Sequence, residues 1–152
     1  MTTTGTGTAW LAAHPGTAWL AHCSPSPTTT HTTWTRGELA PIPGGRTWAV
    51  AELGTLTSIE LMRSLPDEAA LGPVLSHAES DRAWWLVTQH GSDELARVAP
   101  WAAVEVQNPL YCPPANLPLH GRGWLEKPDG TGTLTDAHRL AAALQQHLAY
   151  AG

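Results

Sequence analysis

The fold of this chain is decided by residues 44–136, whose main segments read GGRTWAVAELGTLTSIELM (44–62), VLSHAESDRAWWLVT (74–88), SDELARV (92–98), WAAVEVQ (101–107) and PDGTG (128–132). Strands are expected where apolar residues alternate or run together between turn signals, at residues 46–53, 74–75, 83–88 and 101–107. One helix is expected after the first strand and another after the third. The resulting order predicts an α+β fold with a ferredoxin-like or RRM-like β-α-β-β-α-β sheet and helices packed on one face.

Local signals place the helices and the hairpin inside this unit. Residues 57–60 (TSIE) have the form of a capping box and predict a helix that stops at Pro66. The polar residues 79–82 predict a hairpin between the second and third strands. Ser92 is predicted to cap a short helix over 93–98, whose first turn carries the acids that a helix dipole favours.

The end of the chain carries three further signals. Residues 122–126 predict an edge strand, and residues 128–132 predict a tight turn. Asp136 or Thr135 is expected to cap a final helix that ends near Tyr150. The apolar face of that helix is expected to comprise Leu140, Ala143, Leu144 and Leu148.

The remaining segments define the domain organisation. Residues 1–8 form a Thr/Gly tail that we expect to be disordered, and residues 9–150 are expected to form a single α+β domain. Two short helical turns are predicted within 9–23, separated by Pro and Gly. Residues 24–43 are a Thr/Ser/Pro-rich connecting segment, and residues 108–119 are Pro-rich. Both of these segments are expected to lack regular structure.

Composition limits the classes of partner. Of the 152 residues, 42% are hydrophobic and only 14% are charged, and the formal net charge is −5 with eight Lys and Arg. Because nucleic-acid binding relies on clustered cations, nucleic acid is not an expected partner. There is no signal peptide pattern and no apolar run of about 20 residues, so we expect a cytoplasmic protein that does not bind membranes. The distant Cys23 and Cys112 favour two thiols over a disulfide.

The chain lacks the motifs that bind metals or cofactors. Its eight histidines occur at none of the short spacings, such as HxxxH or HxH, that zinc sites use. There is no GxSxG elbow, and the glycine pairs at 121–123 and 130–132 are too short for a dinucleotide fingerprint. Neither a metal nor a cofactor is therefore predicted.

A few side chains remain as candidates for acid/base chemistry. His77, His90, Glu105 and His120 could come together at a pocket beside the sheet, where the carboxylate pKa would be shifted. Strand alternation in AVEV (103–106) places Glu105 opposite the valines, which makes solvent the simpler environment for it.

Tryptophan is the most unusual part of the composition. The chain has eight Trp, two Tyr and no Phe. Indole is amphipathic, so a Trp-rich face can line a binding surface or fill a core. The candidate ligand-binding residues are Trp48, Trp84, Trp85, Trp101 and Trp124. At least half of them are expected to belong to the core.

Four short segments also carry a resemblance to a known family. GRTW (45–48), LGPV (71–74), WLV (85–87) and PDGTGTLTD (128–136) resemble segments of short actinobacterial (streptomycete) proteins similar to the N-terminal domain of bifunctional DNA primase/polymerases. The resemblance covers about residues 9–148. It implies a primase-polymerase-like fold, whose core is itself an RNA-recognition-like sheet.

The same resemblance argues against polymerase activity in this chain. Such polymerases hold two divalent metals on a D-x-D or D-x-E pair, with a third acid and a strand histidine. The matching strand, residues 48–52, contains one acid at most, Glu52. We therefore expect a non-catalytic binding or regulatory module that uses an aromatic-lined face to bind a small ligand or a protein partner. The alternative is a small cofactor-independent acid/base enzyme of specialised metabolism.

Overall fold

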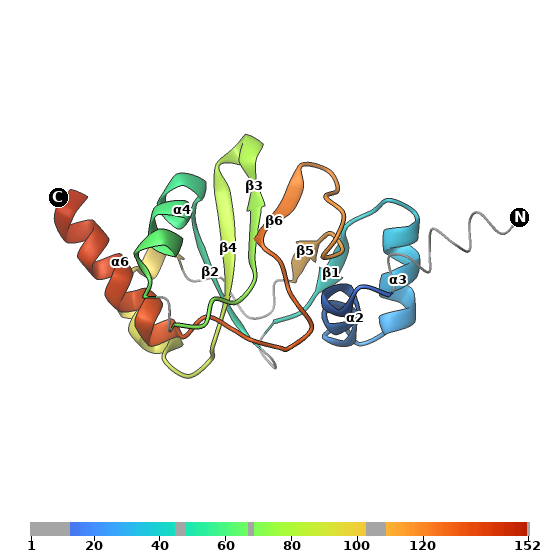
Figure 1. Ribbon diagram of the computed structural model, residues 1–152, viewed down its shortest axis with the longest axis horizontal. Helices are drawn as coiled ribbons and strands as arrows, with labels where there is room; N and C mark the ends of the chain where they lie inside the picture. The colour runs from blue at the N-terminus through green and yellow to red at the C-terminus, as the bar shows by residue number, and fades with distance from the viewer. Residues whose placement is uncertain (1–12, 45–47, 67–68, 103–108, 152) are drawn as a thin grey trace, which may run out of the picture.

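A computed structural model describes residues 13–44, 48–66, 69–102 and 109–151. The helices in these residues are α2 (Pro15–His22), α3 (Pro27–Thr35), α4 (Thr55–Ser64), α5 (Ser92–Val98) and α6 (Ala137–Ala151). The strands are β1 (Ala40–Ile42), β2 (Ala49–Gly54), β3 (Val74–His77), β4 (Arg82–Val87), β5 (Leu110–Cys112) and β6 (Arg122–Glu126). The predicted α+β class and C-terminal helix are confirmed (Figure 1).

The larger sheet has the strand order β2-β4-β3-β6, with every neighbouring pair antiparallel. Because β4 lies between β2 and β3, these strands and α4 form the split β-α-β arrangement that the pattern predicts. The described fourth strand is β6, at the edge expected for residues 122–126. Pro100–Ala102 form a 3-10 turn, so the strand expected over 101–107 does not begin at Trp101. Residues 103–107 lie outside the described residues.

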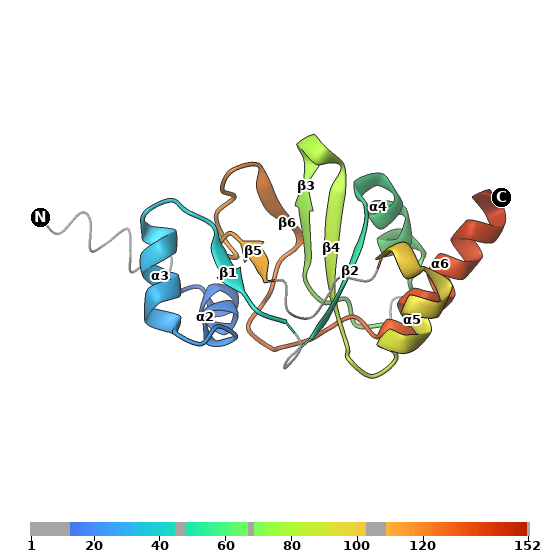
Figure 2. The same ribbon diagram turned by 180° about the vertical axis from the view of Figure 1, so that it is seen from behind.

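The larger sheet lies between two groups of elements (Figures 1 and 2). Helices α4, α5 and α6 cover one face, and α2, α3 and the small β1-β5 sheet lie on the opposite side. Along β4, Trp85 and Val87 belong to the first core, whereas Trp84 and Leu86 belong to the second. A strand with both faces covered has a continuous apolar sequence, which explains AWWLV at residues 83–87.

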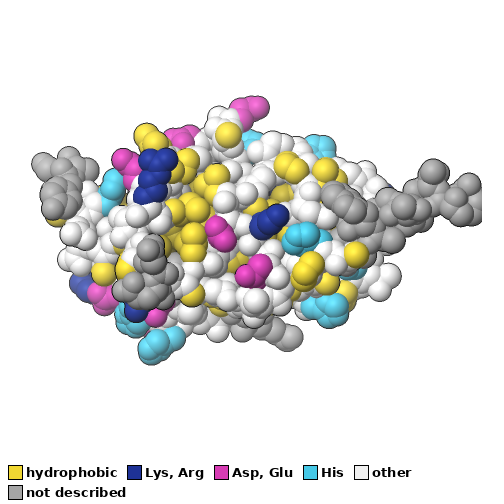
Figure 3. All heavy atoms as spheres, viewed as in Figure 1, with side chains coloured by type: hydrophobic (Ala, Val, Ile, Leu, Met, Phe, Trp, Pro, Cys, Tyr) yellow, Lys and Arg dark blue, Asp and Glu magenta, His cyan; other side chains and the backbone are white. Residues whose placement is uncertain are grey.

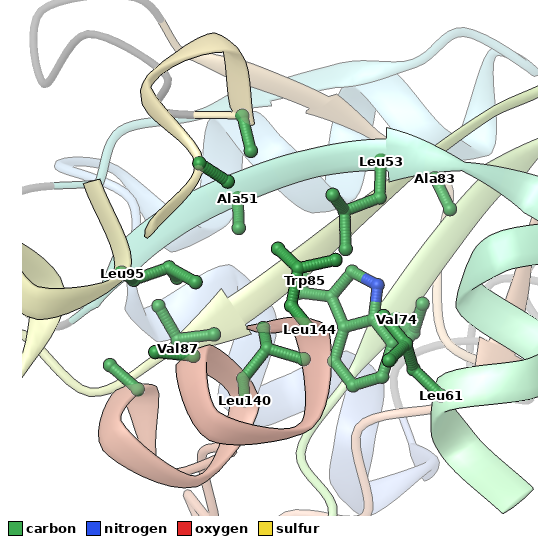
Figure 4. Close-up of a cluster of buried hydrophobic side chains, with 14 residues drawn as sticks. Ala51, Leu53, Leu61, Val74, Ala83, Trp85, Val87, Leu95, Leu140 and Leu144 are labelled. Atoms are coloured by element: carbon green, nitrogen blue, oxygen red, sulfur yellow. The ribbon is translucent and has the colours of Figure 1, made fainter. Parts of the chain in front are cut away.

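The core beneath the helices is built around Trp85. Figure 4 shows its indole between Leu61 of α4, Val74 of β3 and Leu144 of α6. The side chain is fully buried, and its Nε1 donates a hydrogen bond to Ser58 Oγ at 2.9 Å. The indole N–H is therefore satisfied inside an otherwise apolar core.

The predicted capping box at residues 57–60 is wrong. Helix α4 begins earlier, at Thr55, with Gly54 as its N-cap and no capping side chain of its own. Asp81 in the hairpin turn supplies the acceptor instead, because its Oδ1 accepts a hydrogen bond from Thr55 N at 3.2 Å. Ser58 is consequently one turn inside the helix, where it faces Trp85.

The connecting segment 24–43 has more regular structure than expected. It contains α3, whose first residue is Pro27 and whose N-cap Ser26 accepts a hydrogen bond from Thr29 N. It also contains β1, which pairs with β5, so the Pro-rich segment 108–119 is not wholly irregular either. Both expectations failed because these elements are stabilised by distant residues.

Of the other capping and turn predictions, the Ser92 cap is wrong, because Ser92 is the first residue of α5 and Gly91 is its N-cap, with no capping side chain. The cap and the turn predicted near the end of the chain are confirmed. Asp136 Oδ1 accepts hydrogen bonds from His138 N at 2.8 Å and Arg139 N at 3.4 Å, so Asp136 caps α6 as expected. The tight turn at 128–132 is held by Asp129 Oδ1, which accepts from Thr131 N at 2.9 Å. Pro15 begins α2 rather than interrupting a helical segment.

Two further findings bear on the predicted environment. None of the helices in the described residues is both long and apolar enough to cross a bilayer. Cys23 and Cys112 are not joined by a disulfide, and Cys112 is fully buried. Burial raises the pKa of the Cys112 thiol well above its usual range.

Candidate functional site

Two rows of side chains cross the sheet face on the side of α2 and α3, near the β3-β4 turn. The tryptophan row consists of directly opposed residues of β2, β4, β3 and β6, namely Glu52, Trp84, Leu75 and Trp124. The basic row lies one pleat nearer the turn and consists of Gly54, Arg82, His77 and Arg122. Opposed residues of neighbouring strands are in contact range, so each row is continuous across the sheet. Leu75 and Trp84 are buried, whereas the side chains around them in both rows are partly or fully exposed.

Glu52 links the two rows at the β2 edge. Its Oε1 accepts a hydrogen bond from Trp84 Nε1 at 2.8 Å. Its Oε2 lies 3.5 Å from Arg82 Nη1. The carboxylate therefore orients an indole in the tryptophan row and pairs with a cation in the basic row.

Arg122 occupies the opposite end of the basic row. Its guanidinium carbon lies 4.4 Å from the centre of the Trp84 ring, which is cation–π geometry. Its Nη1 donates to the carbonyl oxygen of Tyr111 in β5 at 2.8 Å. Burial lowers the pKa of the Arg122 guanidinium, an effect opposed by Cys112 and Glu52. The side chain is thus a partly desolvated cation held in one orientation.

Trp124 and the histidines complete this surface. Trp124 is partly exposed, and its Nε1 donates to Pro113 O at 3.3 Å. His77 Nδ1 lies 2.6 Å from Ser80 Oγ. His120 lies in the turn that leads into β6 and has a φ of 50°. Its Nε2 lies 2.9 Å from Gly37 O. We call Glu52, His77, Arg82, Trp84, Arg122 and Trp124 the polar-aromatic surface.

The predicted ligand-binding tryptophans do not share one face. Trp84 and Trp124 belong to the polar-aromatic surface. Trp48 and Trp85 are fully buried on opposite sides of the sheet, and Trp48 Nε1 has no acceptor among the described residues. Trp101 is 63% exposed in the 3-10 turn that follows α5. The expectation that at least half of the five belong to the core is confirmed, because Trp48, Trp84 and Trp85 are all buried in the two cores.

The predicted acid/base candidates are also separated. His77 belongs to the polar-aromatic surface, and His120 lies in the turn before β6. His90 lies in the loop before α5, where its ring makes an edge contact with His138 at a centroid distance of 5.2 Å. Glu105 lies outside the described residues. Within the described residues, no histidine forms an ion pair with a carboxylate, and no group of three or more His, Cys, Asp or Glu could hold a metal.

Two grooves in the described part of the chain lie away from these candidates. One, of about 380 Å³, lies between α4 and α6 and is lined by Glu60, Ser64, Ala143, Gln146 and His147. The other, of about 200 Å³, lies between α3 and β1 and is lined mainly by Ser, Thr and Pro side chains. Neither groove contains a predicted site residue.

Arg82 and Arg122 are the site residues that sequence reasoning missed. The available signal was the repeated spacing RAW at 82–84 and RGW at 122–124. Because side chains alternate along a strand, Arg and Trp two residues apart lie on the same face. Only the register, however, brings the two RxW segments together on either side of β3.

Comparison of this chain with protein-family models, curated proteins and solved structures finds no match to any of them. The function must therefore be argued from the polar-aromatic surface itself.

Proposed function

We propose that this protein is a non-catalytic cytoplasmic binding or regulatory module that holds a small ligand on the polar-aromatic surface. The observation that carries the proposal is the Arg122 guanidinium, which stacks on Trp84 and is fixed by Tyr111 O. Trp84 is 7% exposed and supports the cation from below, whereas the partly exposed indole of Trp124 can provide apolar contact for a ligand. A preorganised cation orients such a ligand at little entropic cost. A protein partner presenting the same chemistry is the alternative occupant.

The resemblance to primase/polymerase N-terminal domains enters this proposal as a fold without its metal chemistry. The single carboxylate of β2, Glu52, is engaged by Trp84 and Arg82. A two-metal mechanism requires several carboxylates near one another. The proposed module would therefore retain a related sheet and use it for binding. The acid/base enzyme alternative gains no specific support from the contacts of the described residues.

The test follows the indole N–H signals in ¹⁵N–¹H NMR spectra, assigned with single Trp→Phe variants. The protein is titrated with a panel of nucleotides, organic acids, amines and sugars. We expect saturable shifts of the Trp84 and Trp124 signals. The Trp34 and Trp85 signals should stay in place, because both indoles are fully buried and their N–H groups bond to Cys112 O and Ser58 Oγ, outside the polar-aromatic surface.

The matched control is Trp101→Phe, which removes an exposed indole outside the surface and should leave the affinity unchanged. Trp124→Phe should weaken binding. A ligand whose shifts are confined to Trp101, or whose affinity is insensitive to Trp124→Phe, would contradict the proposed surface.

A further inference from the structure

The basic row contains an unbalanced charge. Arg82 and Arg122 are each directly opposed to His77, from the two strands that flank β3. The two arginines therefore lie on the same face of the sheet, one strand to either side of β3. Glu52 pairs with Arg82 at 3.5 Å, whereas no carboxylate among the described residues lies within ion-pair distance of Arg122. Asp81, in the adjacent turn, accepts a hydrogen bond from Thr55 N.

This arrangement is unusual for such an acidic chain. The net charge is −5 with eight Lys and Arg in 152 residues. On the face seen in Figure 3, Lys and Arg side chains stand as isolated groups rather than as a continuous basic surface. Two arginines at the flanking positions of one strand therefore make a local positive site.

The geometry of Arg122 suits an oxyanion. A guanidinium carries five N–H donors in a planar fork, and one nitrogen of Arg122 is bonded to Tyr111 O. Stacking on Trp84 fixes the plane of the Arg122 guanidinium. The N–H groups of the guanidinium that are not bonded to Tyr111 can bind two oxygens of one acid group. β4 and β6 are two strand spacings apart, roughly 10 Å, so the long Arg82 side chain can approach the same ligand.

We propose that the basic row binds the oxyanion group, carboxylate or phosphate, of a small ligand. Arg122 binds two of its oxygens, Arg82 supplies a second positive charge, and Trp124 contacts the organic part of the ligand. This inference rests on the proposed function and specifies the chemical class of ligand for the same surface.

The experiment titrates the protein with inorganic phosphate and, separately, with citrate, while sodium chloride keeps the ionic strength constant. The Trp84 indole signal and the side-chain Nε–H signal of Arg122 are followed by NMR. We expect a saturable shift of both signals with at least one anion. Response to phosphate alone identifies a phosphoryl ligand, and response to citrate alone identifies a carboxylate ligand.

Two arginine variants test the assignment. Arg122→Gln should weaken anion binding by about tenfold or more. The anion affinity of Arg122→Lys should lie between those of the parent and Arg122→Gln, because lysine keeps the charge but lacks the planar fork of donors. Arg97→Gln is the control, since Arg97 lies on α5 and pairs with Glu94. If Arg122→Gln does not fold, as judged by its indole spectrum, Arg82→Gln replaces it with an expected loss of several-fold.

Three results would overturn the inference: no saturable shift with either anion, equal shifts with sodium chloride alone, or unchanged affinity in the folded Arg122→Gln or Arg82→Gln variant. Failure of the oxyanion inference can be distinguished from failure of the proposed binding function. If a neutral or cationic compound from the panel shifts Trp84 and Trp124 while both anions fail, the surface binds a ligand but not an oxyanion.

Discussion

Trp84 and Trp85 are adjacent in the chain but belong to different cores, because successive strand residues point to opposite faces. Each indole N–H needs its own acceptor. Trp84 donates to Glu52 at a partly exposed edge, and Trp85 donates to Ser58 in a closed interior. The two adjacent tryptophans are therefore both buried, but they pack in different cores and use acceptors from different elements.

Removing the Ser58 hydroxyl should destabilise the protein more than a surface change would. Ser58→Ala leaves the buried Trp85 N–H without its acceptor, which costs about 1–3 kcal/mol of unfolding free energy. Urea unfolding measures the effect. The control is Ser64→Ala on the same helix, where the hydroxyl bonds to Leu61 O at an exposed position, and a change of about 0.5 kcal/mol or less is expected. Equal losses in both variants would contradict the role of Ser58.

Gly16 should not tolerate alanine, although alanine favours helices. A Cβ at Gly16 would lie 1.8 Å from Pro128 O, so α2 would have to move away from the turn at 128–132. We expect Gly16→Ala to lower the unfolding free energy by about 1–3 kcal/mol. Gly123→Ala is the control, since its Cβ would meet its nearest atom, Pro118 Cβ, at 3.6 Å. A Gly16→Ala protein as stable as the parent would show that the close contact is absent in solution.

At the scale of elements, α3 shows how a poor helical sequence is stabilised by its surroundings. Its sequence, PTTTHTTWT, is rich in β-branched threonine, which disfavours helices. Thr32, Thr33 and Thr35 donate their hydroxyls to carbonyls four residues earlier. Trp34 anchors the helix to β5 through a 2.8 Å hydrogen bond from Nε1 to Cys112 O. The helix therefore depends on its tertiary contacts.

The stability of the protein should depend on pH through His31 of α3. Burial and, to a lesser extent, His22 lower the pKa of His31 below its ordinary value of 6.5, and its ring makes an edge contact with Trp34. At pH values between the folded-state pKa of His31 and its unfolded-state pKa of 6.5, the unfolded chain binds more protons than the folded chain. Stability is accordingly greatest above pH 6.5 and is lost as the pH falls through the folded-state pKa.

Urea unfolding at several pH values between 5 and 8 measures this dependence. His31→Gln should lose less stability on acidification than the parent, and His147→Gln on α6 should behave like the parent. An NMR titration of His31 gives its folded-state pKa directly, and a value at or above 6.5 would refute the prediction.

At the scale of the molecule, the larger sheet joins two cores. Leu140 of α6 packs in the core with Trp85, and Leu20 of α2 packs in the core with Trp34 and Trp84. The strands of the sheet contribute side chains to both cores. Loss of either core therefore removes the support of the shared strands.

We expect Leu140→Ala and Leu20→Ala each to lower the unfolding free energy by about 2–5 kcal/mol, with one transition seen by fluorescence and circular dichroism. Leu148→Ala, at a position 37% exposed, should have a much smaller effect. Two separate transitions would mean that the cores unfold independently, and the prediction of one domain over residues 9–150 would then be wrong.

The features that the sequence determined by itself depend on neighbours in the chain. Periodicity and turn residues predicted the hairpin of β3 and β4, the edge strand β6 and the α+β class. Asp136 caps a helix that begins at the next residue. In the hairpin and at the cap of α6, the groups that stabilise the structure lie within a few residues of one another, so the local pattern carries the physical signal.

Only the tertiary structure decided the features that depend on residues far apart in the sequence. Helix α3 and strands β1 and β5 are stabilised through contacts such as Trp34 with Cys112, 78 residues away. Asp81 replaced the expected capping box because the hairpin turn brings it to the start of α4. The stacking of Arg122 on Trp84 likewise requires the register of β6 with β3 and β4. The hairpin turn fixes the register of β3 with β4, whereas β6 pairs with β3 across a long connection, so that register depends on tertiary packing.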